Sequence, residues 1–165
     1  MQIVICPGMH LPELTDRFIA SVPIHSPHII DGDRIPVYSP HHILAHLPTS
    51  PIFLIAFSAG VVGAIGAARL YHQQGGIVRG FVAIDGWGVP LSGAFPIHRM
   101  SHDRFTDWSS ALLGSGVENF YADPAVEHLT MWSAPNKVLG IGAGNRTITA
   151  AQFIAELIER YECDR

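Results

Sequence analysis

Short runs of apolar residues alternate along this chain with segments whose apolar positions recur every three or four residues. The nearly continuous runs predict strands that are covered on both faces, at residues 2–6, 51–57 and 78–84. The segments with helical spacing predict helices that bury one face, at residues 11–21, 59–74 and 149–161. Gly75-Gly76 supplies the stop signal for the second of these helices.

Weaker patterns extend the same alternation through the rest of the chain. They predict shorter strands at residues 35–38, 95–100 and 117–122. They also predict helices at residues 41–46 and 105–113.

The alternation indicates an α/β fold, a three-layer sandwich with a mostly parallel sheet of about six strands and helices on both faces. A length of 165 residues suits a single domain, so we assign residues 1–165 to one unit. Right-handed crossovers bring the carboxyl ends of parallel strands to one edge of the sheet. We therefore expect the loops after residues 6, 57, 84, 100 and 122 to meet there and to carry the functional groups.

Composition removes several classes of function. Apolar residues make up 48% of the chain and charged residues 15%, which is typical of a globular protein. The net charge is −4 and the basic residues are scattered, so we expect no nucleic-acid partner. No apolar run is long enough for membrane insertion, and no signal-peptide pattern is present, so we expect a cytoplasmic protein. A homodimer is compatible with the sequence.

The most informative motif is Ala56-Phe57-Ser58-Ala59-Gly60, where a buried strand passes into a helix within about one residue. Such a turn exposes the side chain at its tip, here Ser58, at the edge of the sheet and at a helix N-terminus. Small residues are needed two positions before and after the tip, and Ala56 and Gly60 meet this need. The simpler alternative is that Ser58 only caps the following helix.

This motif resembles the nucleophile elbow G-x-S-x-G of the α/β-hydrolase superfamily, with Ala56 in place of the first glycine. The resemblance covers most of the chain, and it implies a small hydrolase without the superfamily's usual first two strands and lid. It also implies that Ser58 is the nucleophile and that an acid and a histidine follow it in the chain.

Two loops after Ser58 carry histidines that could act as its base. The resemblance favours His128 as the base and Asp103 as the acid that orients it, because each follows one of the last two predicted strands. His102 is an alternative base. Asp85, at the end of the strand beside the serine strand, and Asp123 are alternative acids.

An acyl-transfer site also needs two amide donors for the oxyanion. The resemblance implies the amide of Ala59, the residue after the nucleophile, and that of Met9, in the loop where Gly8 permits a sharp turn. We expect five residues to lie around the substrate: Gly8, His10, Asp85, Trp87 and His102.

The resulting hypothesis is a serine hydrolase that cleaves a small ester or thioester through an acyl-Ser58 intermediate. It needs no cofactor and no metal, since no metal-binding or nucleotide-binding motif stands in the expected place. The alternative hypothesis is a binding domain that has this fold and lacks the chemistry, because fold alone does not imply function.

Overall fold

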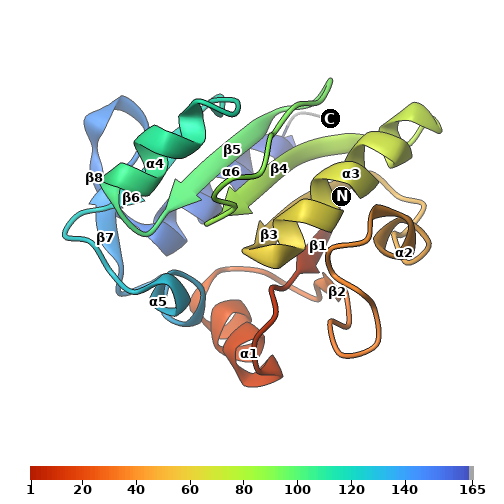
Figure 1. Cartoon of the computed structure of the whole chain (residues 1–165), viewed down its shortest axis with the longest axis horizontal. Coiled ribbons are helices and arrows are strands. Elements are labelled where there is room, and N and C mark those ends of the chain that lie inside the picture. Colours follow the sequence, from red (N-terminus) through yellow and green to blue (C-terminus); the bar gives the residue numbers. More distant parts are fainter. Residues whose placement is uncertain (164–165) are drawn as a thin grey trace.

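A single mostly parallel sheet of eight strands forms the centre of the protein. We describe it from a computed structural model, which describes residues 1–163 (Figure 1). The strand order across the sheet is β2-β1-β3-β4-β5-β6-β7-β8. The strands are β1 (Gln2–Cys6), β2 (His28–Ile29), β3 (Ile52–Phe57), β4 (Val78–Ile84), β5 (Ile97–Ser101), β6 (Asn119–Ala122), β7 (Leu139–Ile141) and β8 (Thr147–Thr149).

The α/β class and the mostly parallel sheet confirm the prediction at that level, but the strand count of about six is too low. The six strands from β2 to β6 in the sheet are parallel, whereas β7 and β8 add an antiparallel edge. These two strands contain three residues each and stand among glycines. They therefore give no alternating apolar pattern by which a strand is recognised.

Helices cover both faces of the sheet, so two apolar layers flank it. The helices are α1 (Pro12–Ser21), α2 (Pro40–Leu44), α3 (Ala59–Gln73), α4 (Arg104–Ala111), α5 (His128–Ser133) and α6 (Ala150–Cys163), with a 3₁₀ turn η1 (Ala143–Asn145). The core on one side includes residues of α2 and α3, and the core on the other side includes residues of α1, α5 and α6. In Figure 1, α3 lies in front of the sheet and α6 lies behind it.

The predicted strand at residues 35–38 is wrong. Ile35 and Val37 are buried, at 8% and 3% exposure, but the segment runs through turns. The segment is buried because it packs closely against α3. The approach is so close that a Cβ on Gly63 of α3 would overlap the carbonyl oxygen of Val37. The strand beside β1 is instead the two-residue β2.

The central position of β3 determines where the site forms. Ile55 of β3 lies opposite Ile5 of β1 and Val82 of β4, in parallel register. The chain leaves β1 toward β2 on one side and returns to β3 on the other. The helices that follow β1 and β3 therefore lie on opposite faces of the sheet, and such sheets bind their ligands at the carboxyl edge beside this point.

Among residues 1–163, no helix combines the length and the apolar character that crossing a membrane requires.

A buried histidine lies in the sheet away from this edge. The side chain of His98 in β5 is fully buried, and its Nε2 lies 2.9 Å from the hydroxyl oxygen of Tyr161. Burial lowers the pKa of His98 from 6.5 to about 4. The unfolded chain therefore binds a proton in a pH range where the folded protein does not.

We predict that His98 makes the protein less stable as the pH falls from 6.5 toward 4. Because the folded pKa lies below the unfolded pKa, the free energy of unfolding decreases on acidification, by about 2 kcal/mol at pH 5 from this group alone. Urea unfolding at pH 7 and pH 5 should show a smaller decrease for His98→Gln than for the wild type. The variant His25→Gln, at an exposed position, should behave like the wild type. An unchanged decrease in His98→Gln would contradict the assignment.

Candidate active site

Ser58 occupies the sharp turn between β3 and α3. Its backbone has φ 51° and ψ −122°, a region that residues other than glycine rarely adopt. Ser58 is the N-cap residue of α3, but its side chain makes no capping hydrogen bond. Its Oγ lies instead 3.1 Å from Nε2 of His128. The hydroxyl is therefore directed at an imidazole and does not serve as a helix cap.

Two glycines allow the loop after β1 to lie against this turn. A Cβ on Gly60 would overlap the carbonyl oxygen of Pro7 and would lie 2.6 Å from that of Cys6. A Cβ on Gly8 would lie 3.1 Å from Cβ of Ser58 and from the carbonyl oxygen of Phe57. A side chain at either position would push the β1 loop away from Ser58. The need for a small residue at position 60 therefore has a direct steric cause.

His128 is held between Ser58 and a carboxylate. It is the first residue of α5, and its Nδ1 lies 2.9 Å from Oδ2 of Asp85. The imidazole stacks on Phe57, with ring centroids 4.7 Å apart, and Phe57 stacks in turn on the buried Trp132. The ring orientation is thus fixed by one apolar face and by partners at both nitrogens.

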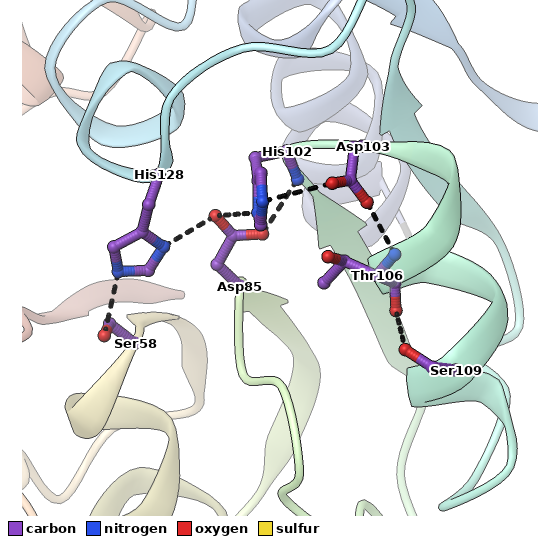
Figure 2. Close-up of polar contacts among 7 residues, drawn as sticks. All are labelled: Ser58, Asp85, His102, Asp103, Thr106, Ser109 and His128. Atoms are coloured by element: carbon purple, nitrogen blue, oxygen red, sulfur yellow. Dashed lines mark hydrogen bonds and ion pairs between the residues drawn. The ribbon is translucent and has the colours of Figure 1, made fainter.

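Asp85 follows β4 directly and has a buried carboxylate, with the side chain 1% exposed. Its backbone also has a positive φ, of 50°. Oδ1 accepts a hydrogen bond from the amide of His102 at 2.8 Å. Oδ2 lies 2.9 Å from Nδ1 of His128 and 3.1 Å from Nδ1 of His102 (Figure 2). The carboxylate therefore connects the ends of β4 and β5 to α5.

The structure differs from the sequence-based choice of the acid. Asp103, predicted to orient His128, is the N-cap of α4, and its Oδ1 accepts a hydrogen bond from the amide of Thr106 at 2.6 Å. This hydrogen bond is the main reason why the pKa of Asp103 is lowered. The carboxylate that contacts His128 is that of Asp85, and Asp123 is exposed. Chain order and loop position did not distinguish these carboxylates, because all three follow strands.

His102 does not face the serine. Its Nδ1 lies against Asp85, and its Nε2 lies 3.3 Å from Oδ2 of Asp103. Both ring nitrogens thus face carboxylates, which leaves neither for Ser58. The structure brings His128, and not the alternative base His102, to the hydroxyl.

The amides of Ala59 and Met9 were predicted from the sequence to bind an oxyanion. Ala59 is the first residue of α3, so its N–H has no acceptor within the helix. Met9 follows Gly8 in the loop packed against Ser58, and it is 78% exposed. In the described part of the chain, neither amide donates a hydrogen bond to another protein group.

A cavity of about 500 Å³ opens beside Ser58 and His128. Three of the residues expected around a substrate line it, namely Asp85, Trp87 and His102. Four further lining residues were not predicted from the sequence: Val62, Val89, Phe105 and Thr106. A signal for Phe105 was available, because Phe105 and Trp108 are large aromatic residues three positions apart on a short helix, and Phe105 is 65% exposed.

Gly8, Met9 and His10 line a second cavity, of about 400 Å³. It extends from the loop after β1 toward the residues that follow β2, and Asp31 and Asp33 are part of its wall. The residues predicted to surround one substrate are thus divided between two cavities. His10 packs near Phe57 and Trp132, with ring centroids 5.6 and 6.0 Å away.

The same network contains a group of side chains that metals use as ligands. Within residues 1–163, Asp85, His102 and His128 each offer one ligand atom, and these atoms lie within 4.8 Å of one another. Each of these atoms already faces a partner inside the group, at 2.9 and 3.1 Å. Hydrogen bonding accounts for this arrangement without an ion.

No protein-family model, curated protein or solved structure matches this chain. The geometry of Ser58, His128 and Asp85 is therefore the basis for a functional assignment. When a hydroxyl contacts an imidazole that in turn contacts a buried carboxylate, the imidazole can activate the hydroxyl as a nucleophile.

Proposed function

We propose that this protein is a serine hydrolase that cleaves a small ester or thioester through an acyl-Ser58 intermediate. The observation that carries the proposal is the continuous set of contacts from Ser58 Oγ to His128 Nε2 at 3.1 Å and from His128 Nδ1 to Asp85 Oδ2 at 2.9 Å. The three residues occur in the chain order serine, acid, histidine, which is that of the α/β-hydrolase superfamily.

In the proposed reaction, Nε2 of His128 takes the proton of the Ser58 hydroxyl while Oγ attacks the carbonyl carbon of the substrate. The amides of Ala59 and Met9 stabilise the negative charge on the carbonyl oxygen. Collapse of the tetrahedral intermediate breaks the bond to the leaving group, and His128 returns the proton to the departing alcohol or thiol. A water molecule, deprotonated by His128, then hydrolyses the acyl-serine and restores the hydroxyl.

Asp85 has the orienting role that the sequence analysis gave to Asp103. Because Oδ2 accepts from Nδ1 of His128, the lone pair of the base lies on Nε2, beside the serine. The carboxylate also stabilises the imidazolium that forms when the proton is transferred.

The cavity beside Ser58 supports a substrate with an apolar acyl group. Val62, Val89 and Phe105 provide an aliphatic and aromatic wall within reach of the nucleophile. Trp87 forms another part of this wall, and its Nε1 donates a hydrogen bond to Oγ of Ser109 at 3.2 Å. Membership of the α/β-hydrolase superfamily belongs to the proposal as well. Ala56 departs from the superfamily pattern, as does the Pro7-Gly8 sequence where His-Gly is often found.

We predict that a fluorophosphonate probe labels the folded protein at Ser58. The probe reacts with an activated serine, and removal of a triad nucleophile typically costs about 10⁴- to 10⁶-fold in rate. Labelling should be lost in Ser58→Ala and retained in Ser50→Ala, an exposed serine before β3 that does not line the cavity. The label should be located by mass spectrometry of the peptide that contains residue 58.

Absence of labelling in correctly folded wild-type protein would contradict the hydrolase assignment. It would favour the alternative, a catalytically inactive binding domain with the same fold.

We predict that Asp85 and Asp103 differ strongly in their effect on the labelling rate. Asp85→Asn should reduce it by about 10³- to 10⁴-fold, because the amide no longer holds His128 in the productive tautomer. Asp103→Asn should reduce it by about tenfold or less, since asparagine also caps helices well. Rates should be compared at one pH after both variants are shown to be folded. Equal losses would contradict the assignment of Asp85 as the acid.

We predict that hydrolysis of p-nitrophenyl esters favours longer acyl chains up to the capacity of the cavity. Each buried methylene contributes about 0.8 kcal/mol, so kcat/KM should rise by about two- to fourfold per methylene from acetate to hexanoate. Phe105→Ala should weaken this preference, whereas Leu112→Ala, at an exposed position outside the cavity lining, should keep it. A profile that is flat in chain length would show that the acyl group does not enter this cavity.

A further inference from the structure

His102 lies next to the proposed triad without touching the nucleophile, and two of the three hydrogen-bond contacts of the Asp85 carboxylate come from it. Its amide donates to Oδ1 at 2.8 Å, and its ring Nδ1 lies 3.1 Å from Oδ2. We propose that His102 is a positioning residue that holds Asp85 in place for His128, so that the network extends from Ser58 to Asp103. This inference rests on the function proposed above.

The main chain of His102 also holds the segment that carries His128. The carbonyl oxygen of His102 accepts a hydrogen bond from the amide of Val126 at 3.0 Å. Val126 lies two residues before His128 in the loop between β6 and α5. One residue at the end of β5 thus fixes both the acid and the loop of the base. Its backbone contacts do not depend on the identity of its side chain, whereas the contact to Oδ2 does.

The contact with Asp85 indicates which nitrogen of His102 acts as the donor. A carboxylate oxygen accepts hydrogen bonds, so Nδ1 of both His102 and His128 must donate to Oδ2 of Asp85. Nε2 of His102 faces a second carboxylate oxygen, Oδ2 of Asp103, at 3.3 Å. The ring of His102 thus lies between two carboxylates, and a leucine or phenylalanine at this position could not donate to Oδ2 of Asp85.

Asp103 anchors the outer end of this network to α4. Its Oδ1 accepts from the amide of Thr106, which fixes the carboxylate on the first turn of the helix. The carbonyl oxygen of Thr106 accepts from the hydroxyl of Ser109, one turn further along. Figure 2 shows these contacts as one continuous path from Ser58 to Ser109. The ring of His102 therefore has a fixed partner on the side away from Asp85.

The role of this arrangement follows from the proton transfer. When His128 takes the serine proton, the negative charge on Oδ2 must already face Nδ1 of His128, because electrostatic stabilisation is most effective when the groups need no reorganisation. Asp85 is 1% exposed on its side chain, so its partners in the protein determine its orientation. The ring of His102 restricts rotation of the carboxylate, and it offers a second donor to the same oxygen.

Two substitutions at residue 102 test the role of the ring. His102→Leu removes the donor to Oδ2, whereas His102→Asn keeps an N–H donor at the same number of bonds from the backbone. We expect His102→Leu to lower kcat for a p-nitrophenyl ester by about 10- to 100-fold, since a hydrogen bond to a charged group is lost. His102→Asn should recover most of that loss. Phe105→Ala, which changes the cavity wall without contacting Asp85, should act mainly on KM for the longer esters.

A second readout does not require turnover. The protons on Nδ1 of His102 and of His128 should give two downfield, nitrogen-coupled ¹H resonances in ¹⁵N-labelled protein, and they should persist in Ser58→Ala. In His102→Leu one resonance should disappear and the other should shift. An unshifted His128 resonance, or a kcat within about twofold of wild type in His102→Leu, would overturn the positioning role. Failure of the proposed function is recognised separately, as the absence of fluorophosphonate labelling in the wild-type protein.

Discussion

The site depends on one buried carboxylate that accepts hydrogen bonds from three N–H groups. Asp85 follows β4, His102 follows β5, and His128 begins α5 after β6, so three successive strand ends meet at this side chain. Parallel strands bring these ends together, and the carboxylate then fixes the two imidazoles relative to each other. Without it, His128 would keep its stacking on Phe57 but would lose the partner that sets its tautomer.

Two strained residues at adjacent strand ends support this arrangement. Ser58 and Asp85 both have positive φ, which costs roughly 1–3 kcal/mol for each residue. The surrounding strands compensate for this cost, because β3 and β4 are completely or nearly completely buried. Gly60 and Gly8 then permit the β1 loop to pack against the turn. The strain is localised at the two residues whose side chains must project from the edge of the sheet.

Much of the site could be predicted because its signals are local. The tight passage from β3 to α3 places Ser58, and the glycines around it have a steric purpose that the sequence pattern already indicates. The acid could not be chosen in this way, since Asp85, Asp103 and Asp123 all follow strands, and only the packing of α5 determines which one meets His128. The edge strands β7 and β8 were missed because three-residue strands among glycines have no periodic pattern.

The most direct test of the central claim, that Ser58 is an activated nucleophile, is to isolate the acyl-enzyme. The protein should be mixed with excess p-nitrophenyl hexanoate, quenched in acid within the first turnover, digested and analysed by mass spectrometry. The account predicts a hexanoyl group on the peptide containing Ser58, with a matching burst of p-nitrophenol that Ser58→Ala lacks. Ester hydrolysis without an adduct or burst, or an adduct on another residue with unchanged turnover in Ser58→Ala, would contradict it.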